Sequence, residues 1–224
     1  NYNLDAVFSS IDSMGRYAYG NQAKIAQWNL ARLAECLLPI LHTDEKKAIG
    51  LATGVIETFD ETYCEYYLQG MRLKFGFLSN KPEDKIIINE LLDLSQRFGV
   101  DYTLVMRELC NVVKTSSDKT ELLAMFLNSI EIDDWIERWR DRLRLETIEP
   151  NGIISTMMNI NPNFIPRNHL IENVIQSAVN NHDFQLFEDL LSVLRNPFDD
   201  HENFQSFKLP PKPNEIVHKT YCGT

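Results

Sequence analysis

The chain has 224 residues and a formal net charge of −10, from 22 basic and 32 acidic side chains. This balance repels nucleic-acid phosphates and anionic membranes, so it argues against either as a partner. Hydrophobic residues make up 44% and charged residues 24%, as in ordinary soluble proteins, and no apolar run could span a bilayer. Residues 1–5 lack the basic and apolar regions of a signal peptide. We therefore expect a cytoplasmic protein, and the missing initiator Met favours a fragment.

A glycine-bracketed turn leads into the most strongly patterned apolar segment near the N-terminus, from Ala23 to Leu41. This segment predicts a helix with a buried apolar stripe, because its apolar residues recur every three or four positions. The members of the stripe are Ala26, Leu30, Leu33, Leu37 and Leu41. Truncating Leu33 or Leu37 should then cost about 2–5 kcal/mol, unless the stripe is exposed toward a part of the protein outside this chain.

Start and stop signals predict further helices up to residue 197. Thr43 can cap a helix that runs to Phe75, with Gly76 as its stop, and internal glycines allow a break inside it. Gly99 would end the next helix. The later helices are expected to begin near Pro82, Asp101, Asp118, Asp134, Asn168 and Asp183. Since no long stretch alternates polar and apolar residues, we predict an all-α fold.

The C-terminal segment reads as an irregular tail, because Pro210, Pro211 and Pro213 disfavour regular structure there. We therefore divide the chain into three parts. Residues 1–22 form an irregular N-terminal segment, residues 23–197 form one helical domain, and residues 198–224 form the proline-rich tail.

The motifs of common catalytic sites are absent from the sequence. It has no glycine-rich phosphate loop, no G-x-S-x-G and no H-E-x-x-H, and its five histidines never stand at ligand spacing. We therefore assign no catalytic, cofactor-binding or metal-binding residue to this chain. Asp133 and Asp134 could pass for a catalytic carboxylate pair, but acidic residues also favour the start of a helix, and we prefer that interpretation.

Four alternate arginines lie around Trp135 and Trp139: Arg138, Arg140, Arg142 and Arg144. On a helix they form two neighbouring rows. One interpretation is a clamp for phosphate or an acidic segment, with arginine stacked on tryptophan. The other is a solvated helix whose arginines pair with Glu137, Asp141 and Glu146, and we prefer it.

The four cysteines are widely scattered, without C-x-x-C or zinc-like spacing, which predicts free thiols in a reducing compartment. Cys36, Cys64 and Cys110 lie in apolar helical segments, so we expect them to be buried and unreactive. Cys222, near the end of the proline-rich tail, should be exposed. It is the one possible redox thiol that we single out, although the residues alone equally allow an incidental cysteine.

Short motifs spread over essentially the whole chain follow the order found in one protein family. Each is weak alone, but together they are specific. They are Gly15-Arg16-Tyr17, Asn21-Gln22, Trp28-Asn29-Leu30, Arg32-Leu33, Met71-Arg72, Lys74-Phe75-Gly76, Asn89-Glu90-Leu91, Asp101-Tyr102-Thr103, Asp134-Trp135, Arg140, Leu143, Asn161-Pro162, Arg167-Asn168, Asn196-Pro197-Phe198, Pro210-Pro211 and Cys222. By these motifs the chain resembles the C-terminal portion of the selenoprotein O family, the YdiU-type protein adenylyltransferases.

The resemblance implies a protein-kinase-like fold, of which this chain would hold C-lobe helices, a C-terminal helical extension and an irregular tail. Residues 1–22 would be the end of the activation segment. Family members transfer AMP from ATP to Ser, Thr or Tyr hydroxyls of proteins, with Mg²⁺. Their catalytic, nucleotide-binding and metal-binding residues lie upstream, so the resemblance places none of them in this chain.

The resemblance therefore implies ATP and Mg²⁺ as cofactors of the intact protein only, and predicts that this chain alone is inactive. The implied partners are protein substrates and the upstream catalytic half of the same protein. The competing hypothesis is a non-catalytic helical protein-interaction module.

The resemblance also bears on Cys222. Some bacterial members carry an activation-segment cysteine that can pair with the C-terminal one. The matching position here is Phe8, which has no sulfur. We therefore expect Cys222 to remain a free thiol within this chain.

Overall fold

The computed structural model describes residues 1–115 and 118–221, and these contain α-helices and short 3-10 helices but no strand. The predicted all-α class is confirmed. The α-helices are α1 (Gln22–Leu41), α2 (Glu45–Glu57), α3 (Phe59–Lys74), α4 (Asp84–Phe98), α5 (Tyr102–Thr115), α6 (Thr120–Met125), α7 (Ile130–Leu143), α8 (Pro150–Ile160), α9 (Asn168–Asn181) and α10 (Gln185–Arg195). The 3-10 helices are η1 (Tyr19–Asn21), η2 (Glu202–Lys208) and η3 (Pro213–Glu215).

The chain separates into two compact units, and the boundary between them falls inside α3. We call Asn3–Gly70, together with the end of the chain from Lys219, the hairpin unit. We call Asn1–Tyr2 with Met71–His218 the core unit. The boundaries that we expect from the sequence at residues 22 and 197 do not coincide with these units, and they stay a prediction.

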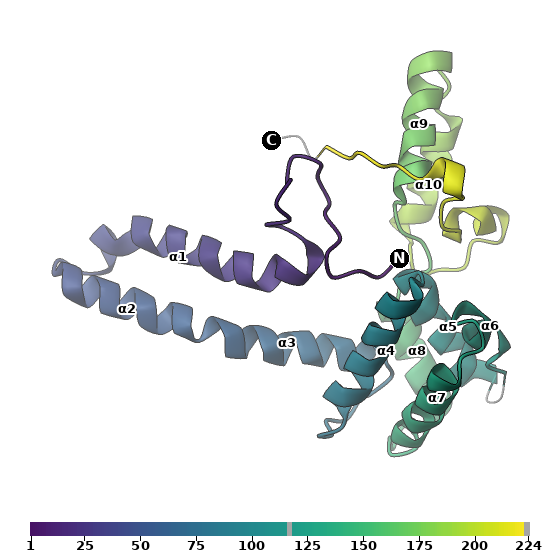
Figure 1. The fold of residues 1–224 in the computed structure, drawn as a ribbon, viewed down its shortest axis with the longest axis horizontal. Coiled ribbons are helices and arrows are strands. Elements are labelled where there is room, and N and C mark those ends of the chain that lie inside the picture. The colour runs from purple at the N-terminus through teal and green to yellow at the C-terminus, as the bar shows by residue number, and fades with distance from the viewer. Residues whose placement is uncertain (116–117, 222–224) are drawn as a thin grey trace. The chain divides into compact units, whose positions relative to one another are not determined.

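The hairpin unit is built on α1 and α2, which lie side by side, with α3 continuing beyond α2 (Figure 1). The helix predicted from Thr43 to Phe75 is therefore two helices. They are separated at Thr58, whose hydroxyl and backbone N–H both donate to the carbonyl of Val55. The predicted cap is wrong by one residue, because the Asp44 carboxylate accepts hydrogen bonds from the backbone N–H groups of Lys46 and Lys47 in the first turn of α2.

The apolar stripe of α1 is not buried, which corrects the prediction from its spacing. Leu33 is 54% exposed and Leu37 is 38% exposed, and Leu30 and Leu41 are exposed as well. Within the hairpin unit the stripe faces α2 and the start of α3, and this packing leaves its side chains partly exposed. Helical periodicity thus identified the apolar face but not the depth of its burial.

The exposure of Leu33 changes the expected cost of truncating it. Leu33→Ala should lower the free energy of unfolding by about 1 kcal/mol or less, because little apolar area is returned to water. The matched control is Leu91→Ala on α4, where the side chain is fully buried and truncation should cost about 2–5 kcal/mol. Urea denaturation of both variants measures the difference. Equal losses of stability would show that Leu33 is buried in solution.

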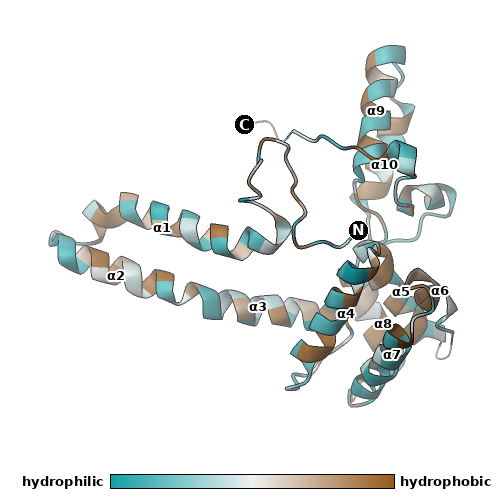
Figure 2. Cartoon of the chain, viewed as in Figure 1, coloured by the Kyte–Doolittle hydropathy of each residue, from teal (hydrophilic) through white to brown (hydrophobic). Residues whose placement is uncertain are grey.

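The core unit carries the main hydrophobic core, with apolar residues concentrated on α4, α5, α7 and α8 (Figure 2). Trp135 and Trp139 of α7 stack with their ring centroids 5.7 Å apart, and both are fully buried. Their indole N–H groups donate to the backbone carbonyls of Ile87, at 2.8 Å, and Phe75, at 2.9 Å. Burial of these large rings therefore leaves neither indole donor unsatisfied.

The ends of the core helices test the predicted signals. Gly76 (φ 81°) follows α3 and Gly99 (φ 61°) follows α4, so both predicted stops are confirmed, with the left-handed backbone that favours glycine. The predicted start at Asp134 is wrong. Helix α7 begins at Ile130, because the Ser129 hydroxyl caps it by accepting the N–H of Glu131.

The tail beyond α10 contains only the short turns η2 and η3 among its described residues, in line with the predicted irregular segment. Across residues 1–115 and 118–221, no helix combines the length and the apolar character that crossing a membrane requires.

Candidate functional site

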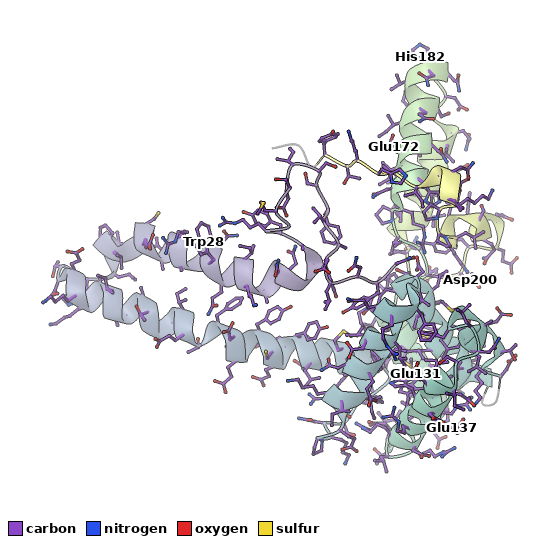
Figure 3. All side chains as sticks on the ribbon, viewed as in Figure 1. Trp28, Glu131, Glu137, Glu172, His182 and Asp200 are labelled. Carbon is purple, nitrogen blue, oxygen red and sulfur yellow. The ribbon has the colours of Figure 1, made fainter. Side chains whose placement is uncertain are left out.

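The irregular segment before α1 is held by side chains that bond to its own backbone. The Asp12 carboxylate accepts hydrogen bonds from the backbone N–H groups of Arg16, at 2.8 Å, and Tyr17, at 2.7 Å. The Gln22 side chain donates back to the carbonyl of Tyr17 at 2.6 Å. These bonds order the turn that leads into α1. The Arg16 guanidinium lies 4.2 Å from the ring centre of Trp28, which Figure 3 labels on α1.

The end of the chain is hydrogen-bonded to this segment. The backbone N–H of Ser10 donates to the carbonyl of Thr220 at 2.7 Å, and the Thr220 hydroxyl donates to the carbonyl of Phe8 at 3.0 Å. Cys222 lies outside the described residues, so its predicted redox role is not tested. Thr220, two residues before it, nevertheless contacts Phe8, the position that the resemblance pairs with the C-terminal cysteine.

This contact gives a direct prediction. Phe8→Cys should form an intramolecular disulfide with Cys222 on mild oxidation, because a disulfide needs Cα atoms within about 7 Å and Thr220 already lies against position 8. Mass spectrometry of the non-reduced, alkylated protein would identify the joined peptides. The unmodified chain should give no such cross-link.

Met14→Cys is the matched control, because Met14 is 90% exposed in the same segment. Equal cross-linking of Cys222 to positions 8 and 14 would contradict the specific contact, as would no cross-link at position 8.

The burial of the other three cysteines agrees with the prediction for one of them and differs for two. Cys110 is buried, as expected; its thiol donates to the carbonyl of Met106, and burial raises its pKa, so it stays protonated. Cys36 and Cys64 are exposed, so their predicted burial is wrong. They lie on α1 and α3 of the hairpin unit, where the same partial packing that exposes Leu33 leaves them accessible.

The hairpin unit has an apolar groove of about 280 Å³ between α1 and the α2–α3 junction, which we call the hairpin groove. Its walls include Leu30, Leu33 and Leu37 from α1, with Val55 and Phe59 opposite. The groove offers contact area for another protein segment. Its lining residues carry no charged side chain and no thiol.

An aromatic ladder continues from this groove along α3. The rings of Phe59 and Tyr63 stack at 6.0 Å, and those of Tyr63 and Tyr67 at 5.9 Å. Burial, with smaller contributions from neighbouring tyrosines, raises the pKa of Tyr67 to about 12, so its phenol stays neutral at physiological pH. The ladder therefore extends the uncharged surface of the groove.

The arginine run on α7 forms the pairs that the solvated interpretation expects. Arg140 pairs with Glu137, Arg144 with Asp141, and Arg142 with Glu146. That interpretation is wrong about Arg142, however, because its side chain is only 1% exposed.

Arg142 belongs to a buried ionic network in the core unit. Its Nε donates to the fully buried carboxylate of Asp84 at 2.6 Å, and Arg72 donates to the same carboxylate at 2.8 Å. Burial alone would raise the pKa of Glu146, but hydrogen bonds from Arg142 and Ser79 outweigh it and hold that pKa below its ordinary value. The charges balance inside the network, which makes it a structural anchor.

The alternative of a clamp with arginine stacked on tryptophan is not what the structure shows for Arg142. Its guanidinium lies over the ring of Phe77, 4.6 Å from the centroid, while Trp135 and Trp139 are buried in the core.

Other motif residues of the core unit also form buried polar contacts. Asn161 donates to the carbonyl of Lys74 and accepts from its ammonium group, whose pKa burial lowers. Arg167 binds Asp101 through two hydrogen bonds, of 2.6 and 3.2 Å. Helix signals alone gave Lys74, Asn161 and Arg167 no role, and only the family motifs pointed to them, whereas Asp101 was already expected to begin a helix. The structure shows that they tie helix ends and loops together.

The chain belongs to the SelO family: the family model described as "Protein adenylyltransferase SelO" matches residues 1–195. The protein nucleotidyltransferase YdiU of Rhizobium etli is 42% identical over 223 residues, and that of Bradyrhizobium diazoefficiens is 41% identical over 223 residues. Each match covers 100% of this chain and 45% of the relative. The chain therefore spans less than half the length of these relatives and corresponds to their C-terminal portion. The family resemblance inferred from the motifs is confirmed.

Proposed function

We propose that the chain is the helical C-terminal portion of a protein adenylyltransferase, which transfers AMP from ATP to Ser, Thr or Tyr hydroxyls of proteins. The observation that carries this proposal is the match over the whole chain to relatives named protein nucleotidyltransferases. The intact protein would use ATP and Mg²⁺, act on protein substrates and work in the cytoplasm. This chain would support an upstream catalytic half.

The chemistry of nucleotidyl transfer supports placing catalysis outside this chain. Such transfer needs cations and positioned donors around the phosphates, and a group that orients the attacking hydroxyl. Among the described residues, no group of three or more His, Cys, Asp or Glu side chains is arranged to hold a metal ion. We assign no step of the reaction to the residues of this chain.

A non-catalytic interaction module remains the second candidate. The hairpin groove favours it, because an exposed apolar surface of this kind commonly contacts another protein segment. The two candidates differ in whether a catalytic half accompanies the chain.

Labelled ATP separates these candidates. The 224-residue chain, and the longest reading frame that contains it, would each be incubated with Mg²⁺, candidate proteins and ATP labelled at the α- or γ-phosphate. The proposal predicts α-label on protein with the longer product and none with the chain alone. Label from the chain alone would reveal a site here, and γ-label would indicate phosphoryl transfer. A reading frame without a catalytic half, or a longer product without activity, would favour the interaction module.

A further inference from the structure

A row of exposed apolar side chains runs along α9 in the core unit, and we call it the α9 stripe. It consists of Ile171, Ile175 and Val179, which are 36%, 47% and 67% exposed. Because each follows the previous one after one helical turn, all three lie on one face of the helix. Leu170, on another face, is buried, and α9 packs against α10. The stripe therefore stays open to solvent after α9 has packed against its neighbour.

Local helix formation does not explain the α9 stripe. Isoleucine and valine form helices less readily than alanine, leucine, lysine or glutamate, because their branched Cβ atoms lose rotamer freedom. Facing only water, they gain no burial in return. Phe184, which follows the turn from α9 to α10, is also exposed, at the end of the helix pair where Val179 lies. Exposed apolar surface of this kind marks a contact with another molecule.

The charged side chains around the stripe are all acidic. From Asn168 to Leu194 the sequence contains Glu172, Asp183, Glu188 and Asp189, but no lysine or arginine. Glu172 stands one turn before Ile175 and therefore borders the stripe; Figure 3 labels it on α9. Within residues 1–115 and 118–221, neither Glu172 nor Glu188 has an ion-pair partner for its carboxylate.

This charge pattern decides which occupant fits the stripe. Nucleic acid and anionic membranes are repelled by an acidic border. A second copy of the chain, docked face to face, would bring the same carboxylates together, and such a juxtaposition of like charges is unfavourable. A protein helix whose apolar ridge is flanked by lysine or arginine would cover the stripe and also give Glu172 a cationic partner.

We propose that the α9 stripe binds a basic amphipathic helix of a partner protein. Apolar residues of that helix, spaced by three or four positions, would pack against Ile171, Ile175 and Val179. Its lysines or arginines would pair with Glu172. The proposal does not rest on nucleotidyl transfer, because the stripe requires no catalytic group.

A suitable probe is a synthetic fluorescent helix with leucines along one face and lysines beside them. It would be titrated into the whole 224-residue chain and followed by fluorescence anisotropy. We expect saturable binding that weakens as the ionic strength rises, because salt screens exposed charges. A peptide with the same leucines but glutamates in place of the lysines should bind at least about tenfold more weakly.

Two variants test the apolar and the ionic contact separately. Ile175→Gln removes an apolar side chain without changing the charge, and it should weaken binding of the lysine peptide by about tenfold. Glu172→Gln should weaken it by about threefold or more and reduce its dependence on ionic strength. The matched controls are Ile86→Gln and Glu121→Gln, at exposed positions of α4 and α6, and both should leave the affinity unchanged.

The proposal is overturned if the lysine peptide does not saturate the chain, or if the glutamate peptide binds equally well. Equal losses of affinity for a stripe variant and its control would overturn it too, since they indicate unspecific attraction to an acidic protein. Self-association of the chain that Ile175→Gln abolishes would assign the stripe to a second copy instead. Loss of peptide binding in the longest reading frame that contains the chain would assign the stripe to another part of the same protein.

Discussion

Replacing Asp84 by Asn should destabilise the core unit by about 3–5 kcal/mol, because it removes the buried charge that two arginines share. The Asp84 carboxylate is fully buried and accepts hydrogen bonds from Arg142, Arg72 and the backbone N–H of Lys81. The amide of Asn can accept from one of these donors, but it leaves the buried guanidinium of Arg142 with one carboxylate partner, Glu146, in place of two, and the network with one uncompensated positive charge. An uncompensated buried charge is costlier than a lost contact at the surface.

Urea denaturation followed by circular dichroism measures this loss of stability. Glu90→Gln is the matched control: it also removes a carboxylate paired with an arginine of α7, but Glu90 and Arg138 are partly exposed. Because solvent screens exposed ion pairs, this control should cost about 1 kcal/mol or less. Similar unfolding midpoints for the two variants would show that water reaches the Asp84 network.

The sequence predicts helices well where local signals decide. Gly76 and Gly99 adopt the left-handed backbone that ends α3 and α4, and their position could be inferred because few other residues tolerate it. The start of α7 could not be decided from local signals, because two residues could cap it. Ser129 and Asp134 are both acceptable caps, and only the structure shows that the Ser129 hydroxyl is the one that bonds to the helix.

Burial is less predictable, because it depends on what packs against a helix. Leu33 of α1 and Leu91 of α4 both lie on apolar faces with helical spacing, yet one is half-exposed and the other fully buried. Helix α4 lies in a core contributed by several helices, whereas α1 packs against α2 and the start of α3, which leaves its apolar stripe partly exposed. Periodicity records which face is apolar, and the number of neighbours is a property of the tertiary fold.

The ion pairs of the arginine run are also predictable only where the partner is close in the sequence. Pairs within α7, such as Arg140 with Glu137, follow from their separation in sequence. The partner of Arg142, Asp84, lies 58 positions away, so no local rule could find it.

Trp135→Ala should cost about 3–5 kcal/mol, the range for removing a fully buried aromatic ring from a core. The ring stacks on Trp139, meets Phe75 edge-on at 6.1 Å, and donates its indole N–H to the carbonyl of Ile87. Alanine would leave a cavity at the centre of the core unit and an unpaired buried carbonyl. Thermal and urea unfolding would both register the loss.

Two further tryptophan variants separate the causes of this loss. Trp135→Phe keeps much of the ring volume but removes the donor to Ile87, so its cost should lie between those of the parent and Trp135→Ala. Trp28→Ala removes a ring that is 46% exposed and stacked by Arg16, and should cost about 1 kcal/mol or less. If Trp28→Ala were as costly as Trp135→Ala, the assignment of the main core to the helices around α7 would be wrong. If Trp135→Phe were as costly as Trp135→Ala, the lost hydrogen bond rather than the cavity would dominate.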